Sequence, residues 1–222
     1  MDTRTVGDLK ILIPDLDPRD LDTVEEPPDG ELLEALVDGA DWAGLELDTA
    51  RLRLSRLVQV NLANATWRRP TVSGCRFEQV DLSGARLEDA TIERCEFVGC
   101  RLTGLQLTDT TLKNVIFDNC RLDYAILTQV RTTGPTAVLD CNLDHATMTH
   151  CQLGQTVISR CQFDEVETHR LRPTRRRSPR NRPVDHDRHL KPSGQRRHRR
   201  PDQRTRGHPR PRTGSDRTSG LG

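Results

Sequence analysis

Residues 75–129 divide into eleven consecutive five-residue words: CRFEQ VDLSG ARLED ATIER CEFVG CRLTG LQLTD TTLKN VIFDN CRLDY AILTQ. In each word the third residue, which we call the centre, is leucine, phenylalanine or isoleucine, and the first residue is small or apolar. The other three positions are mostly polar. The same pattern extends from Leu45 to about Arg170. A fixed internal period indicates a repeat architecture, and it outweighs local preferences for helix or strand.

The five-residue period favours short extended segments over a helix. Residues two positions apart on an extended segment point to the same side, so the first residue and the centre of each word share one face. The last two residues of the word then have to turn the chain. A helix would advance about 500° in five residues, and its apolar positions would drift around the axis. We therefore expect straight segments with a corner after each word, wound into a coil with the apolar residues inside.

The spacing of the phenylalanines sets the number of words in each coil. Phe77, Phe97 and Phe117 follow one another at steps of four words, so coils of four words would stack them and coils of three words would scatter them. The sequence therefore predicts an all-β fold, a right-handed four-sided (quadrilateral) parallel β-helix. The words also resemble those of the pentapeptide-repeat family, whose pattern is A(D/N)LXX. This resemblance implies the same quadrilateral β-helix.

One extra residue interrupts the period. Centres recur once per word from Leu47 to Leu127, with Thr132 next, and resume one residue late at Val138. We predict Pro135 as the extra residue, because proline cannot donate to a strand ladder and suits a bulge or a corner loop. With this correction the array holds about six coils, stacked at roughly 4.8 Å.

Stacking of like words also predicts the core. The expected core residues are Phe77, Phe97, Phe117, Leu82, Leu102, Leu122, Leu143 and Phe163, with Cys100, Cys120, Cys141 and Cys161 as a ladder of thiols. All seven cysteines occupy the first position of a word, and no CxxC pair exists. This pattern favours free, buried thiols over a zinc site. Parallel side chains about 4.8 Å apart also exceed the usual Cβ separation of ~3.5–4.5 Å in a disulfide.

Three segments of unlike charge suggest three parts of the chain: residues 1–44, 45–170 and 171–222. The first part carries 13 acids and 3 bases. Asp29 as an N-cap and Gly39 as a stop predict a short helix there, which would cap the first coil. Residues 14–29, which are acidic and rich in proline, are expected to be loose.

The last part is basic and rich in arginine and proline, with 17 bases and 4 acids. It has too few apolar residues to fold alone, so we predict a disordered tail. Two interpretations stay open: a tail that binds nucleic acid through phosphates, or a translation of the wrong frame of a GC-rich gene. Its sequence DHDRH, Asp185–His189, would hold a metal only if something ordered it.

No catalytic, cofactor-binding or metal-binding residues are predicted. The words contain no glycine-rich phosphate loop, no nucleophile with a neighbouring base and no paired carboxylates. We therefore expect a non-enzymatic protein without a cofactor, an interaction scaffold for an unknown protein partner. No apolar run is long enough to cross a membrane and no export signal is recognisable, so we expect a cytoplasmic protein. The sequence leaves the oligomeric state open.

An alternative function is DNA mimicry. The chain resembles the family branch that binds type II topoisomerases and protects bacteria from fluoroquinolones, which implies DNA gyrase as a partner. Mimicry needs a contiguous acidic strip along the rod. The candidate residues are the acids concentrated in the middle of the array: Glu78, Asp81, Glu88, Asp89, Glu93 and Glu96. With 16 acids and 13 bases, residues 45–168 are only weakly negative, which argues against mimicry.

Overall fold

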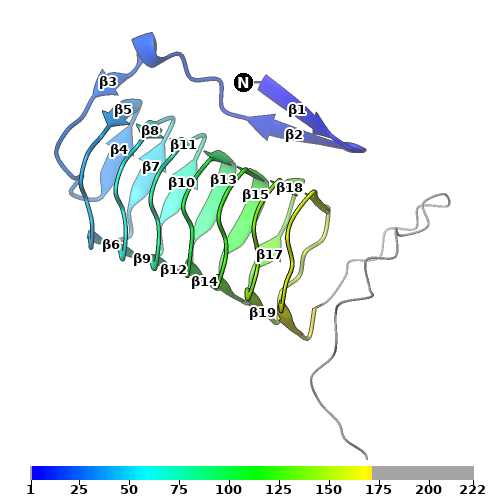
Figure 1. The fold of residues 1–222 in the computed structure, drawn as a ribbon. Helices are drawn as coiled ribbons and strands as arrows, with labels where there is room; N and C mark the ends of the chain where they lie inside the picture. The colour runs from blue at the N-terminus through cyan, green and yellow to red at the C-terminus, as the bar shows by residue number, and fades with distance from the viewer. Residues whose placement is uncertain (1, 172–222) are drawn as a thin grey trace, which may run out of the picture. The chain divides into compact units, whose positions relative to one another are not determined.

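The computed structural model of the protein describes residues 2–171, and the sequence-predicted tail beyond Leu171 lies outside them (Figure 1). Short parallel strands follow one another around a central axis, and each coil stacks on the one before it. Strand partners are four words apart through most of the array. Phe77, for example, pairs with Leu57 on the preceding coil and with Phe97 on the next. The predicted four-sided parallel β-helix is confirmed.

Each side of the β-helix is a ladder of equivalent words, and we number the sides 1 to 4 in chain order from β5. Side 1 consists of β5 (Ala35–Asp38), β8 (Arg56–Val58), β11 (Arg76–Glu78), the second halves of β13 (Thr91–Val98) and β15 (Thr111–Asp118), β18 (Thr136–Leu139) and β20 (Thr156–Ser159). Side 2 is held by single bridges between Asp41, Asn61, Asp81, Arg101, Arg121, Asn142 and Gln162.

Sides 3 and 4 complete each coil. Side 3 consists of β6 (Glu46–Asp48), β9 (Thr66–Arg68), β12 (Arg86–Glu88), β14 (Gln106–Thr108), β16 (Ile126–Thr128), β19 (Thr147–Thr149) and β21 (Glu167–His169). Side 4 consists of β4 (Glu31–Leu33), β7 (Arg51–Arg53), β10 (Thr71–Ser73), the first halves of β13 and β15, and β17 (Arg131–Thr132). Side 3 is a seven-stranded sheet, so the array has one coil more than the sequence predicted.

The fifth residue of each word makes the corner. This residue has a positive φ even where it is not glycine, as at Gln79 (53°) and Asp89 (53°), with an exception at Gly134 beside the extra residue. The left-handed conformation costs a non-glycine residue on the order of 1–2 kcal/mol. Hydrogen bonds between coils offset this cost: the Gln79 amide donates to the carbonyl of Val98 at 2.9 Å, and the Asp89 amide donates to that of Thr108 at 3.0 Å.

The interior is built from stacked side chains. The Phe77 and Phe97 rings are 4.6 Å apart and nearly parallel, and Phe97 and Phe117 are 4.8 Å apart. All three rings are buried, as are the leucines expected in the neighbouring column, Leu82, Leu102, Leu122 and Leu143. Phe163, the next member of that column, is 41% exposed. It lies on the last coil, where no further coil within residues 2–171 covers it.

The extra residue of the array lies where the period predicts it. Leu112 pairs with Thr132, a step of four words, whereas Val115 pairs with Thr136, a step that is one residue longer. The additional residue is therefore inserted between Thr132 and Thr136, in the stretch that contains Pro135.

The predicted N-terminal helix is wrong. Residues 31–38 form β4 and β5, and within residues 2–171 the only helical turn is η1 (Pro18–Asp20). Leu32 and Val37 are buried centres of two further words, followed at the same spacing by Trp42. The apolar residues Leu32, Leu33, Leu36 and Val37 are compatible with one face of a helix and also with two five-residue repeat words. The parallel ladder decides between them, because β4 pairs with β7 and β5 pairs with β8.

The chain before the array is ordered at several points, contrary to the expectation that residues 14–29 are loose. Strand β3 (Asp22–Thr23) pairs with β5 and extends side 1 by one strand. The indole Nε1 of Trp42 donates to the carbonyl of Glu25 at 3.2 Å. This segment therefore lies over the first coil, the position that the sequence assigned to a capping helix.

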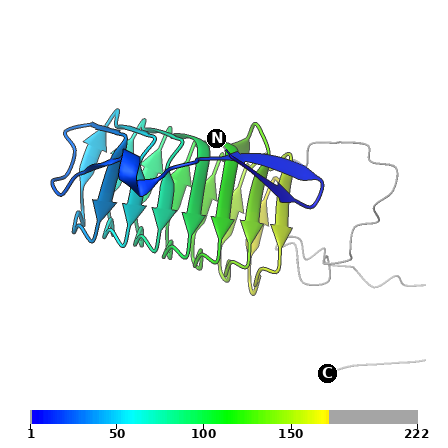
Figure 2. The same ribbon diagram turned by 90° about the horizontal axis from the view of Figure 1, so that it is seen from above.

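An antiparallel hairpin of β1 (Asp2–Val6) and β2 (Leu9–Ile13) precedes this segment. It lies along side 1 of the β-helix, near β13, β15 and β18 (Figure 2). Ile11 is fully buried against Ile116, Ala137 and Leu139, which form a second small core on the outside of the rod. The sequence did not predict this docked hairpin.

Candidate binding site

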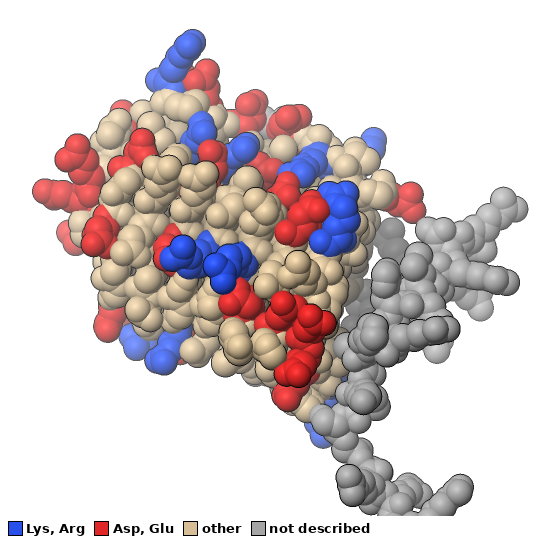
Figure 3. Space-filling view, in the orientation of Figure 1, with Lys and Arg blue, Asp and Glu red and all other residues tan. Residues whose placement is uncertain are grey.

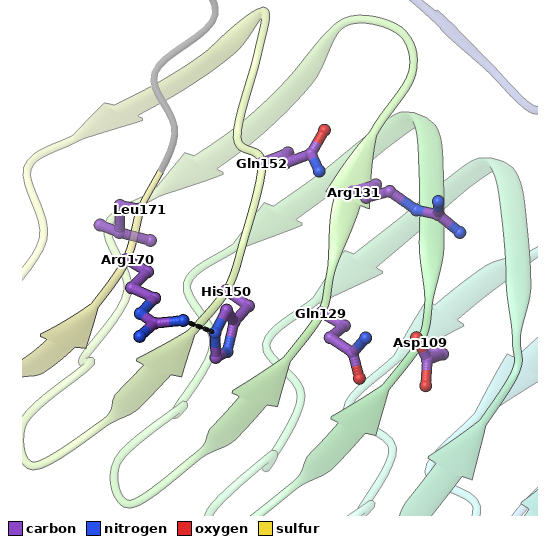
Figure 4. A pocket seen from close by; sticks show the side chains of 7 residues that line it. All are labelled: Asp109, Gln129, Arg131, His150, Gln152, Arg170 and Leu171. Atoms are coloured by element: carbon purple, nitrogen blue, oxygen red, sulfur yellow. Dashed lines mark hydrogen bonds between the residues drawn. The ribbon is translucent and has the colours of Figure 1, made fainter.

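A groove runs along the corner between sides 3 and 4 at the C-terminal end of the array (Figure 4). We call it the corner groove. Its volume is about 860 Å³, and it is lined by Asp109, Gln129, Arg131, His150, Gln152, Arg170 and Leu171. None of these residues was among the functional residues predicted from the sequence.

The corner groove lies between two rows of polar side chains. The first row consists of corner residues with positive φ, one from each of four coils: Asp109, Gln129, His150 and Arg170. The second row, on side 4, consists of Arg131 and Gln152, whose backbones are joined by an isolated parallel β-bridge. Each row repeats at the coil spacing, so the hollow between them follows the axis of the rod. The rigid backbone therefore fixes the spacing of these side chains.

The charges in the corner groove are not balanced. Within residues 2–171, neither Arg131 nor Arg170 has a carboxylate at ion-pair distance. Nη1 of Arg170 lies 3.4 Å from Nε2 of His150 (Figure 4). Asp109 lies at the opposite end and is the single acid among the described residues that line the groove. Two guanidinium groups thus face one carboxylate in a hollow open to solvent.

An aromatic edge lies at the other corner of side 3. Tyr124 is 56% exposed and stacks on the His145 ring, with a centroid distance of 4.8 Å. Ile126, at the start of β16, is 44% exposed. Nδ1 of His145 lies 3.2 Å from a carboxylate oxygen of Glu165. Strands β16 and β19 therefore carry exposed apolar and aromatic groups at one edge and the corner groove at the other.

The acids proposed for DNA mimicry do not form a strip. Glu78 and Glu96 lie on side 1, Asp81 on side 2, Glu88 and the adjacent corner residue Asp89 on side 3, and Glu93 on side 4. Glu96 is also buried, at 2% exposed. Successive words of one coil face different sides, so a run of acids close in sequence is spread around the rod.

Most of these acids are also paired with a base. The pairs and their N–O distances are Glu78–Arg56 (2.9 Å), Asp81–Arg101 (3.1 Å), Glu88–Arg68 (3.9 Å), Glu93–Lys113 (3.1 Å) and Glu96–Arg76 (3.3 Å). Basic groups lie next to acidic ones at several places on the face displayed in Figure 3. The described surface around these acids is therefore of mixed sign.

The cysteines are free thiols, and Cys100, Cys120 and Cys141 are buried in one column, with Cys161 partly exposed at its end. The Cys120 amide lies 3.4 Å from Sγ of Cys141. A hydrogen bond with Cys100 raises the pKa of the Cys120 thiol to about 12, and one with Cys120 raises the pKa of Cys141 to about 12. Thiols of such high pKa are poor nucleophiles and poor metal ligands at neutral pH.

Neither a cluster of metal-binding side chains nor a membrane-spanning helix is found among the described residues. Within residues 2–171, no three His, Cys, Asp or Glu side chains are grouped so that they could hold a metal ion. None of the described segments is a helix long and apolar enough to cross a bilayer. Asp185–His189 lies outside the described residues. The cytoplasmic location stays a prediction.

Residues 71–136 match the family model described as "Pentapeptide repeat region". These residues span β10 to the start of β18, where the spacing of the words is regular almost throughout. Residues 71–136 are therefore a pentapeptide-repeat region, and the same five-residue words and four-sided coil continue on both sides of it. No curated protein sequence is a significant match for the chain.

Solved pentapeptide-repeat structures are similar to parts of the chain. HetL, a pentapeptide repeat protein involved in heterocyst differentiation regulation in the cyanobacterium Nostoc sp., is 21% identical over 58% of this chain, with a TM-score of 0.35. The chain spans 62% of the length of HetL. QnrB1, a plasmid-mediated fluoroquinolone resistance protein, is 12% identical over 66% of this chain and 88% of its own, with a TM-score of 0.34. Rfr23 from the cyanobacterium Cyanothece is 18% identical over 60% of this chain and 86% of its own, with a TM-score of 0.16. The fold assignment rests on the strand pairing of this chain.

Proposed function

We propose that this protein is a non-enzymatic scaffold that binds a protein partner along side 3 of its last coils. The observation that supports this function is the exposure of Tyr124 and Ile126 at 56% and 44% on a rigid coil. Aromatic residues are enriched where proteins bind one another, because they bury a large area and lose few rotamers. Most other bulky apolar side chains of the array point inward. Tyr124 and Ile126 are unusual because both are exposed, at word positions that are mostly polar elsewhere.

The surroundings of Tyr124 and Ile126 suit a protein interface. His145 stacks on the tyrosine ring and restricts its motion, which limits the entropy lost on binding. The neighbouring strands β16 and β19 present threonines, which can both donate and accept hydrogen bonds. A central apolar anchor with polar groups around it is the common arrangement of a protein interface.

Site-specific crosslinking in cells tests the scaffold function. The photoreactive amino acid p-benzoylphenylalanine replaces Ile126 in the full-length protein, and in a control it replaces Gln106, which occupies the same position of β14 one coil earlier. We expect one discrete crosslinked protein from position 126 that is absent from position 106. The Tyr124→Ala variant should reduce this product. Equal crosslinking at both positions, or none at position 126, would contradict the proposal.

DNA mimicry with gyrase as the partner is the competing function. The scattered and paired acids of the array argue against it, because mimicry depends on a continuous negative surface. A gyrase supercoiling assay with micromolar protein separates the two functions. The scaffold proposal expects unchanged supercoiling, whereas inhibition that depends on the array would favour the mimic.

A further inference from the structure

We propose that the corner groove binds an acidic segment of the partner, with Arg131 and Arg170 each receiving a carboxylate. This inference deepens the proposed function and rests on it for the identity of the ligand as a protein. The groove lies beside side 3, so a partner held by Tyr124 and Ile126 can reach it.

Elsewhere on the rod, most arginines are already paired with an acid. Most arginines of the array pair with a carboxylate on their own or a neighbouring coil, as Arg69 does with Asp48 at 2.7 Å and Arg160 does with Asp140 at 2.6 Å. Arg131 and Arg170 have no such partner within residues 2–171 and both face one hollow. A guanidinium without a partner in a concave site can bind an incoming carboxylate without breaking an existing ion pair.

The dimensions of the corner groove fit a short extended peptide. Its corner row covers three coil steps, which at roughly 4.8 Å each give a length of roughly 14 Å. An extended peptide rises about 3.3 Å per residue, so the groove accommodates about four residues. Its volume of about 860 Å³ is within the range of known ligand sites. Arg131 and Arg170 are two coils apart, so they would contact different side chains of one peptide.

The side chains that line the corner groove favour a peptide that carries carboxylates. Arginine presents a planar fork of donors that matches a carboxylate with two parallel hydrogen bonds. Gln129 and Gln152 add amide groups that can pair with the peptide backbone. Asp109 at one end repels acidic residues, so the acidic part of the ligand should occupy the end with Arg170 and His150. The groove therefore selects the direction of the peptide as well as its charge.

An acidic peptide suits the corner groove better than a nucleic acid does. Nucleic-acid binding depends on many phosphate contacts by lysine and arginine along the backbone. Among the described residues two arginines line this groove, and one acid, Asp109, lies at its end. A short peptide can place two carboxylates on the arginines and avoid Asp109.

Binding of a labelled oligoglutamate peptide of roughly six residues to the full-length protein tests this inference by fluorescence anisotropy. Arg131→Gln and Arg170→Gln should each weaken binding roughly fivefold, and the double variant more. Arg51→Gln is the matched control, since Arg51 occupies the same column of side 4 four coils earlier and has no ion pair within residues 2–171. The bases beyond Leu171 contribute equally in every variant, so the informative quantity is the difference between variants.

Two further variants sharpen the result. Arg131→Lys should retain part of the affinity, because it keeps the charge and loses the fork of donors. Asp109→Asn should strengthen binding roughly twofold, because it removes the repulsive carboxylate. All of these side chains are at least partly exposed, so thermal midpoints should stay unchanged.

The outcomes separate this inference from the proposed function. If Arg131→Gln and Arg170→Gln bind the peptide as Arg51→Gln does, the groove inference is wrong, even where crosslinking at position 126 succeeds. If crosslinking at position 126 fails while the groove variants still lose peptide binding, the proposed function falls and the groove remains an acidic-peptide site. If the same variants reduce binding of a single-stranded oligonucleotide and leave the peptide unaffected, the groove is a nucleic-acid site and the inference is overturned.

Discussion

Arg4 and Asp118 are 114 residues apart in sequence, and Nη2 of Arg4 donates to a carboxylate oxygen of Asp118 at 2.6 Å. Close to this pair, the amide of Leu12 donates to the side-chain oxygen of Asn114 at 3.3 Å, and Ile11 fills an apolar hollow on side 1. Ion pairs of Arg4 with Asp118 and Glu96, the hydrogen bond of Leu12 and the apolar packing around Ile11 thus join the hairpin to the rod.

Truncating Ile11 should release the hairpin before the rod unfolds. Removal of a fully buried isoleucine side chain costs about 2–5 kcal/mol, and a segment with few contacts can open locally. We expect Ile11→Ala to accelerate trypsin cleavage at Arg4 and Lys10 roughly tenfold or more, with a much smaller change in the thermal midpoint. Leu12→Ala is the control, because that side chain is 42% exposed. Similar cleavage rates for the two variants would show that Ile11 does not hold the hairpin.

The phenylalanine stack should be a major source of stability. Phe97 lies between two rings at 4.6 and 4.8 Å, and the coils on both sides limit how far the rod can collapse into a cavity. We expect Phe97→Ala to lower the free energy of unfolding by about 3–5 kcal/mol, measured by denaturant titration. Phe163→Ala, at the exposed end of the rod, should cost about 1 kcal/mol or less. A loss at Phe97 as small as that at Phe163 would argue against a stacked core.

The fold could be predicted because the backbone repeats with the sequence. Each centre meets the centre four words later, so the columns of Phe77 and Leu82 follow from counting words. Two features of the fold could not be predicted from the repeat period: the first words of the array and the docked hairpin. The words at Leu32 and Val37 also fit an amphipathic helix, and only pairing with β7 and β8 decides between the two structures. The docked hairpin depends on outward-facing residues such as Ile116, which the repeat pattern leaves free.

The candidate site was missed for a related reason. Its residues come from four coils, and none stands out within its own word. Writing the coils beneath one another, with the one extra residue allowed for after Gln129, would have put Gln129, His150 and Arg170 in one column. Placing these residues in one column, however, does not predict which of them form ion pairs. Arg131 has no ion-pair partner within residues 2–171, and this depends on where its side chain lies. The repeat period predicts which residues share a column, but it does not predict side-chain contacts. The scattering of Glu78 to Glu96 over four sides, by contrast, could have been derived from the period.

The thiol ladder should be unreactive in the folded protein. Six of the seven cysteines are buried, and hydrogen bonds along the ladder raise the pKa of Cys120 and Cys141 to about 12. The hydrogen bond from Cys120 lowers the pKa of Cys100, but Cys100 is only 1% exposed, so a reagent cannot reach it. We expect a colorimetric thiol reagent at pH 8 to label less than one thiol per chain within minutes, and all seven in denaturant. Rapid labelling of several thiols in the native protein would show that the ladder is open.

Glu96 should make the stability of the rod fall as the pH rises through its titration. The carboxyl group is buried beneath the hairpin, and this burial raises its pKa above the ordinary value near 4.5. Arg76 and Arg4 act in the opposite direction, whereas Asp118 and Glu78 raise the pKa further. The folded state therefore binds the Glu96 proton more tightly than the unfolded state does. Stability from this group is fully present below the unfolded pKa and is lost as the pH rises through the folded pKa.

The test is denaturant unfolding of the wild type and Glu96→Gln between about pH 4 and pH 7, a window that spans the ordinary glutamate pKa and the range just above it. We expect the stability of Glu96→Gln relative to the wild type to increase with pH in this window, because glutamine lacks the ionisation that the buried site disfavours. Glu88→Gln, at an exposed position of side 3, is the control for the same substitution outside a buried site. A difference between wild type and Glu96→Gln that is flat with pH, or that changes in the opposite direction, would mean that the arginines around Glu96 outweigh its burial.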